Sequence, residues 1–294
     1  MRGWATALAI LFTVPAAHAD EEHPREKVPY PDAIIRRPLT LPQSLLEVGG
    51  KFSPTIVGPD GFEHFPLTPF GSYGITDAIT LGIFTDDSFC FGARCVGRFT
   101  GDTKVFNDLS LDTKIRLVDE SKLDEDLRLS VAFHGGVDAV SLTSPFAFGP
   151  RLGALARLRM KSFAVIADPS IYIGVTSRDR EVNLTNSDAS LSIPVNRDRL
   201  SIPLTAIYQV EPTFALFLRT GVNGDLTGYG FGNTWRLPLG VGASLTVDHT
   251  IDLFASFTFP ELTGTSGVSH ERLVFQIGAA FRFDLSKPPP PVEN

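Results

Sequence analysis

The segment 271–285, ERLVFQIGAAFRFDL, decides the fold because its residue types alternate along its length. One face carries the apolar side chains, which are those of Leu273, Phe275, Ile277, Ala279, Phe281, Phe283 and Leu285. The other face carries small residues and the polar side chains of Arg272, Gln276, Arg282 and Asp284. A period of two predicts a β-strand with an apolar environment on one side and a polar one on the other.

The same alternation recurs along the chain and predicts an all-β protein. It is clear at 109–117, 127–134, 235–247 and 251–259. Weaker candidates are 45–53, 66–74, 78–85, 149–160, 163–175, 199–209 and 213–222, and Pro169 and Pro203 predict a bulge or a break in two of them. The total is about twelve strands, and several reach the length that a tilted strand needs to cross a membrane.

The connections between these segments differ in length in a regular way. Every second connection is a turn, at 74–77, 118–126, 160–162, 210–212 and 248–249. The intervening connections are longer, at 54–65, 86–108, 137–148, 176–198, 223–233 and 260–270. Short turns at one end and long loops at the other predict an antiparallel up-and-down transmembrane β-barrel. A soluble β-sandwich or jelly roll also alternates, and it is the alternative fold.

The two ends of the chain lack the period-two alternation of the middle. Arg2, the apolar stretch 4–17 and the sequence Ala-His-Ala at 17–19 predict a signal peptide and export. The predicted organisation is a signal peptide at 1–19, a charged and proline-rich periplasmic extension or plug at 20–43, the transmembrane barrel at 44–285 and a Pro-rich tail at 286–294.

The two cysteines, Cys90 and Cys95, predict a loop disulfide in an oxidising compartment. Two cysteines without nearby histidines do not complete a tetrahedral metal site, so we expect no metal and no cofactor. The net charge of −7 argues against a nucleic-acid partner, which would favour a basic stripe.

Two stretches resemble bacterial outer-membrane barrels. The segment 73–82, YGITDAITLG, looks like the strand-turn-strand of twelve-stranded porin-like transporters. The end of the last strand, Phe281-Arg282-Phe283, is similar to the C-terminal targeting signal of such barrels, although residues 284–294 follow it here. The resemblance implies a bacterial outer-membrane location, with membrane lipid around the barrel.

If the apolar positions face lipid, the cations between them face the lumen. The pore-lining candidates are Lys51, Lys114, Arg116, Arg128, Arg157, Arg159, Arg199, Arg219, Arg236, Arg272 and Arg282. Rings of Arg and Lys favour anions, so we predict a passive channel or transporter for small polar, possibly anionic, solutes. In the alternative, these cations pair with lumenal acids and the closed barrel has a structural or adhesive role through its outer loops.

A lipid-modifying barrel hydrolase is a third hypothesis. Ser269, His270 and Glu271 contain the residue types of a nucleophile, a base and an orienting acid. Neighbours in a loop rarely face each other productively, and His134 has no evident nucleophile beside it. We therefore predict no enzymatic activity. The oligomeric state does not follow from the sequence.

Overall fold

The computed structural model describes residues 30–57, 61–85, 89–91, 108–142, 146–176, 179–183, 190–194, 196–228, 230–265, 267–268 and 272–286. The strands are β1 (Leu45–Phe52), β2 (Thr55–Val57), β3 (Gly61–Thr76), β4 (Ile79–Phe84), β5 (Phe89–Phe91), β6 (Leu109–Lys122), β7 (Leu127–Ser141), β8 (Ala147–Met160), β9 (Phe163–Ala167), β10 (Ser170–Tyr172), β11 (Asp179–Asn183), β12 (Ser190–Pro194), β13 (Arg199–Glu211), β14 (Phe214–Asp225), β15 (Arg236–Val247), β16 (Ile251–Gly264), β17 (Gly267–Val268) and β18 (Arg272–Asp284). Two short 3-10 helices are η2 (Ile34–Arg36) and η4 (Phe231–Asn233). None of the helices described is long and apolar enough to cross a membrane.

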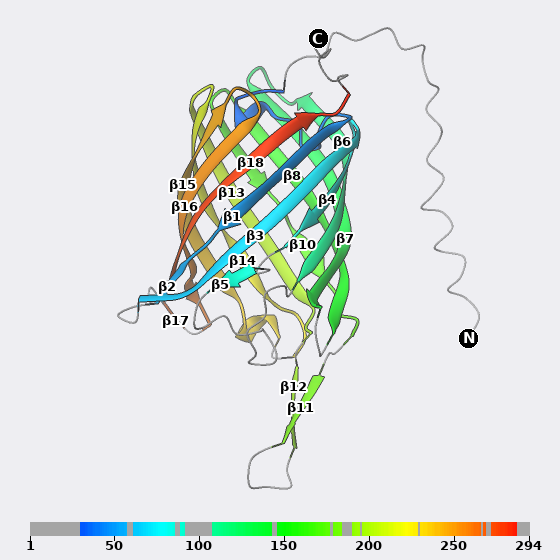
Figure 1. The fold of residues 1–294 in the computed structure, drawn as a ribbon, viewed down its shortest axis with the longest axis vertical. Coiled ribbons are helices and arrows are strands. Elements are labelled where there is room, and N and C mark those ends of the chain that lie inside the picture. The colour runs from blue at the N-terminus through cyan, green and yellow to red at the C-terminus, as the bar shows by residue number, and fades with distance from the viewer. Residues whose placement is uncertain are drawn as a thin grey trace, which may run out of the picture. The chain divides into compact units, whose positions relative to one another are not determined.

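These strands form a closed antiparallel barrel. We call each complete crossing of the wall a stave. The barrel has twelve staves, fewer than the labelled strands, since some labelled strands are consecutive parts of one stave. The first stave is β1 with β2, and the seventh is β9 with β10. The barrel closes where β1 pairs with β18, from Leu45 opposite Asp284 to Phe52 opposite Ile277. Figure 1 shows the strands tilted around the barrel, with β1, β3 and β18 side by side. Closure leaves no free sheet edge along the wall.

The predicted strands are confirmed: each of the twelve segments forms all or part of one stave of the barrel. The alternative of a sandwich is wrong, because one continuous sheet closes on itself. Pro169 separates β9 from β10 as predicted, whereas Pro203 lies inside β13, opposite Gly221, without a break. The turn predicted at 118–126 is shorter, since β6 extends to Lys122 through two bulges.

The predicted outer connections are partly wrong. Strands β7 and β8 extend into 137–148 and leave only 142–146 between them, and β2 and β3 take up most of 54–65. Strand β16 likewise continues to Gly264. The sequence signal ended too early because alternation weakens where a stave projects beyond the apolar belt. Within 176–198, β11 and β12 form a two-stranded sheet of their own, without pairing to the barrel strands described.

The outer face of the barrel is apolar. Large hydrophobic side chains alternate outward along the staves and remain exposed, among them Leu81, Leu111, Phe133, Leu152, Leu218, Val241, Phe257 and Ile277. An apolar surface of this extent would be unstable in water. Since a closed barrel also satisfies all its backbone groups within the wall, both features fit a hydrocarbon environment.

Replacing Phe257 by arginine tests this assignment. Phe257 points outward in the middle of β16, so we expect the free energy of unfolding from lipid vesicles to fall by about 2–4 kcal/mol. The control is Leu285→Arg, directly after the end of the last stave, where the cost near the interface is about 0–1 kcal/mol. Equal costs at the two positions would contradict a membrane-embedded belt.

Candidate functional site

The inner face of the barrel is polar and partly filled by the chain preceding β1. Buried polar side chains alternate inward along the staves, including Thr80, Asp112, Ser130, His134, Arg157, Ser244, Asp252 and Arg282. The short turns and both ends of the wall, Leu45 and Asp284, share one mouth. In outer-membrane barrels the short-turn end is the periplasmic one.

Residues 31–43, called here the N-terminal segment, lie inside this mouth and contact opposite sides of the wall. Near β3 and β4, the Leu41 amide donates to Thr80 Oγ1 at 2.7 Å, and Thr40 Oγ1 donates to the Asp77 carbonyl at 2.7 Å. On the other side, the Ile35 amide donates to Gln209 Oε1 of β13 at 3.4 Å. The segment therefore extends across the mouth.

Ile35 anchors the N-terminal segment by apolar contact. Its side chain is 2% exposed and packs against Ala164, Ile207 and Ala215, which face inward from β9, β13 and β14. Phe217 packs against the same cluster. Burial of an isoleucine side chain contributes about 1.5–3 kcal/mol, so this contact holds the segment firmly against the wall.

Arg37 connects the N-terminal segment to a buried ionic network. Its guanidinium donates to both carboxylate oxygens of Asp252, at 2.5 and 2.9 Å, and to Thr246 Oγ1 at 2.8 Å. Asp252 also accepts from Arg282, whose Nε donates to Glu47 at 2.8 Å. Two arginines thus face two acids. These four residues, Arg37, Glu47, Asp252 and Arg282, are called here the mouth network, and they join β1, β16 and β18 to the N-terminal segment.

The structure places most of the predicted cations in ion pairs. Arg282 pairs with Glu47 and Asp252, and both Arg157 and Arg159 pair with Glu120. The other paired cations are Arg116 with Asp119, Arg199 with Asp225, and Arg236 with Glu261. Lys51 and Arg272 are also engaged in interactions. At the periplasmic mouth, pairing with lumenal acids therefore dominates.

Three of the predicted cations differ: in the part of the chain that the structure describes, Lys114, Arg128 and Arg219 have no acidic partner. Arg219 follows the inward-facing Phe217 at a spacing of two on β14, and its guanidinium carbon lies 4.5 Å from the centre of that ring. Arg219 is exposed although it points inward. These three side chains provide positive charge that no acidic side chain among the described residues neutralises by an ion pair.

A charged patch, called here the ionic wall, lies on β6–β9. His134 Nε2 is 2.7 Å from Asp168 Oδ1, and its Nδ1 is 3.6 Å from Asp112. Arg151 lies 3.6 Å from Asp112 as well. His134 reaches across β8 because Gly153 has no side chain there; a Cβ at Gly153 would lie 2.2 Å from Nε2. Among the described residues no group of His, Cys, Asp or Glu is arranged to hold a metal ion.

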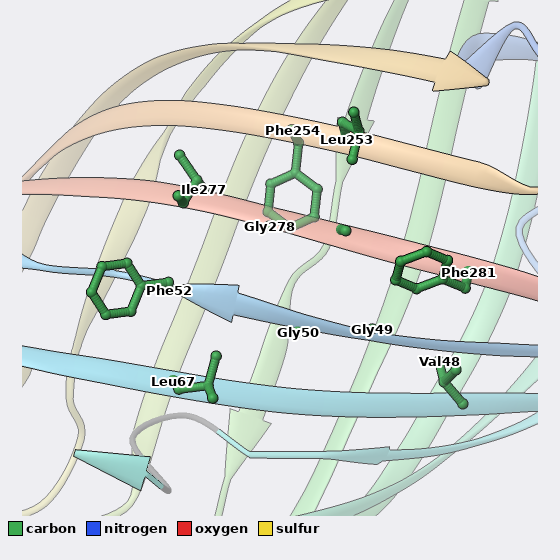
Figure 2. Close-up of a pocket in the computed structure, with 11 residues that line it drawn as sticks. Val48, Gly49, Gly50, Phe52, Leu67, Leu253, Phe254, Ile277, Gly278 and Phe281 are labelled. Carbon is green, nitrogen blue, oxygen red and sulfur yellow. The ribbon is translucent and has the colours of Figure 1, made fainter. Parts of the chain in front are cut away.

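A shallow apolar hollow of about 700 Å³ lies on the outside of the barrel, where β1 meets β18 (Figure 2). Leu67, Leu253, Ile277 and Phe281 line it, and all four side chains are exposed on the outer face. The inward-facing Phe254 also lines the hollow, at Gly278, where the wall has no side chain.

Sequence reasoning missed several residues of the lumen. Arg151 has the same alternation as Arg157 and Arg159 on one strand, so its inward position was predictable. Ile35 and Arg37 gave no signal, because the proline-rich lead has no periodicity to show which side chains are buried. Inward-facing phenylalanines were missed because aromatic residues were assigned to the lipid face.

Other predictions fall on residues outside the described part of the chain. These are the signal peptide at 1–19, the acidic lead at 20–29, the tail beyond residue 286, and Ser269, His270 and Glu271. The disulfide between Cys90 and Cys95 stays a prediction, since Cys95 is also outside it.

No protein-family model matches the chain, and no curated protein matches it in sequence. Solved structures do match in fold. The COG4313 outer membrane channel from Pseudomonas putida F1 has a TM-score of 0.52 at 14% identity, over 83% of this chain and 97% of that one. The NanC porin has a TM-score of 0.49 at 11% identity, over 80% of this chain and 98% of that one. The KdgM porin in complex with disordered oligogalacturonate has a TM-score of 0.48 at 8% identity, over 81% of this chain and 99% of that one. The match to the COG4313 channel agrees with the closed antiparallel barrel of twelve staves described above, which is the fold of porin-like outer-membrane barrels.

Proposed function

We propose that the protein is a passive channel of the bacterial outer membrane for small polar solutes, with a preference for anions. The observation that carries the proposal is the imbalance of unpaired charge in the lumen. Six of the described acids on the inner side lie within 4 Å of a basic group, and these are Glu47, Asp112, Glu120, Asp168, Asp225 and Asp252. Lys114, Arg128 and Arg219 remain, so a solute in the lumen meets net positive charge.

The N-terminal segment makes the periplasmic mouth the narrow part of this path. It crosses the mouth and is fixed by Ile35 and by the mouth network. We therefore propose that residues 31–43 act as a plug that limits passage, and that a conducting state requires this segment to move.

The test is the reversal potential of the purified mature protein in planar bilayers under a KCl gradient. The wild type should be anion-selective. Arg219→Gln should lower the anion-to-cation permeability ratio by up to about fivefold, because a unit charge at about 4 Å in water contributes about 1 kcal/mol. Arg236→Gln is the control, since Arg236 is already paired with Glu261 at the rim. Selectivity for cations, or none, would reject the anion preference.

A structural or adhesive barrel is the second candidate, and the β11–β12 sheet favours it. A two-stranded ribbon outside the barrel sheet offers a surface for a partner, whereas a simple pore does not need one. The bilayer experiment separates the two: absence of current from wild type and from plug-released variants would favour this second role.

A further inference from the structure

Three phenylalanines face the lumen, each directly opposite a glycine on the adjacent stave. Phe217 of β14 pairs in register with Gly242, Phe254 of β16 with Gly278, and Phe70 of β3 with Gly49. In each pair the ring lies on the glycine: a Cβ there would be 2.4 Å, 2.2 Å and 2.5 Å, respectively, from the nearest ring atom. Figure 2 shows the Phe254 ring crossing β18 at Gly278.

Glycine at these positions lets the ring lie along the wall instead of projecting into the lumen. A ring in this position covers the neighbouring backbone with one face, and the Phe217 ring also packs against the Ile35 cluster and lies under the guanidinium of Arg219. Phe84 extends the series, since it pairs in register with Phe70 and lies over Gly82. Phe70, Phe84, Phe217 and Phe254 are called here the aromatic arc.

The aromatic arc and the ionic wall occupy different parts of the circumference. The arc runs along consecutive staves from β14 through β16, β18 and β1 to β4, whereas the ionic wall occupies β6–β9. The lumen therefore carries the four rings on one part of its circumference and the ionic wall on another, and the staves of the arc also carry the mouth network close to the periplasmic mouth. Arg219 stands at one end of the arc, with its guanidinium 4.5 Å from the Phe217 ring centre.

We infer that this lumen binds organic anions with a flat apolar group, of the aromatic carboxylate class. Such a solute would place its ring against the aromatic arc and its carboxylate on the guanidinium of Arg219. Aromatic rings pair favourably at such surfaces, and the planar guanidinium binds a carboxylate through two parallel hydrogen bonds. The inference rests on the proposed channel function and narrows it from small anions to one solute class.

Tight binding requires both the ring of the solute, which contacts the aromatic arc, and its carboxylate, which binds Arg219. A small anion without a ring gains only the charge interaction with Arg219. A ring without charge gains only the arc. If the four rings served only to fill the wall, their replacement would change stability and leave solute binding unchanged.

The test measures binding of benzoate to the full-length mature protein in detergent by saturation-transfer NMR, with acetate and benzyl alcohol as partial solutes. Benzoate should bind more tightly than either. Arg219→Gln should weaken benzoate binding by about tenfold, the equivalent of one charge-assisted hydrogen bond of about 1.5 kcal/mol. Phe254→Leu, which keeps apolar volume and removes the ring, should also weaken it.

The matched control is Phe257→Leu on the same strand, because Phe257 faces outward and is 50% exposed. Equal binding of benzoate and acetate would overturn the inference, and so would benzoate binding that is unchanged in both Arg219→Gln and Phe254→Leu. Because binding is measured without ion flow, a protein that binds benzoate but passes no current would reject the channel and keep the solute class. A protein that conducts ions but does not bind benzoate would keep the channel proposal and reject the solute class.

Discussion

Replacing Arg37 by alanine should raise the ionic current through the barrel severalfold. Arg37 holds the N-terminal segment to Asp252 through two charge-assisted hydrogen bonds, and Asp252 keeps Arg282 as a partner when Arg37 is removed. The variant therefore weakens the plug without leaving a buried carboxylate alone. Loss of about 1.5–3 kcal/mol shifts the equilibrium toward the released segment by about tenfold or more. The measurement is the open probability of single channels in planar bilayers.

The matched control is Arg36→Ala. Arg36 is the neighbouring residue, carries the same charge and is exposed, so its loss should leave the current close to that of the wild type. A chain that lacks residues 31–41 gives the upper limit of the effect. If Arg37→Ala and the shortened chain both conduct like the wild type, the N-terminal segment does not limit passage and the plug proposal is wrong.

Asp252→Ala should have the largest effect on stability. Its removal takes one carboxylate from two buried guanidinium groups, those of Arg37 and Arg282, and of these two Arg282 also pairs with Glu47. Breaking a buried ion pair from one side costs about 3–5 kcal/mol, because the remaining charge is neither solvated nor neutralised. Urea unfolding in lipid vesicles, followed by tryptophan fluorescence, measures the change in the free energy of unfolding.

Glu261→Ala is the comparison for this variant. Glu261 also pairs with an arginine, Arg236, but the Arg236 side chain is 55% exposed. Exposed pairs contribute about 0–1 kcal/mol, so Glu261→Ala should be nearly neutral. If the two variants cost the same, the mouth network is solvated and does not contribute as a buried network.

The barrel could be predicted from sequence because its signal is local. In β18 every second side chain points out of the barrel, so Phe281 and Phe283 are apolar and Arg282 between them is not. The same rule placed Arg157 and Arg159 on the inner face. The alternation rule failed where strands extend beyond the apolar band on the outer face of the barrel. An example is β7, which continues to Ser141 through residues that no longer need to alternate.

The interior could not be predicted because it depends on contacts between distant parts of the chain. Arg37 and Asp252 are 215 residues apart, and no spacing in the sequence connects them. The aromatic arc depends on register: Phe254 opposite Gly278 is visible only once the two strands are aligned. Which cations keep a free charge was likewise undetermined, since Arg219 and Arg236 look alike in sequence and differ only in their neighbours.

The mouth network also has a consequence for the order of assembly. Glu47 belongs to the first stave and Arg282 to the last, so their contact can form only when the two ends of the wall have met. Arg37 finds Asp252 in the same place, and contacts of such long sequence separation form late in folding. The N-terminal segment can therefore dock in its mouth only in a barrel that has closed, and a half-built wall offers it no complete binding site.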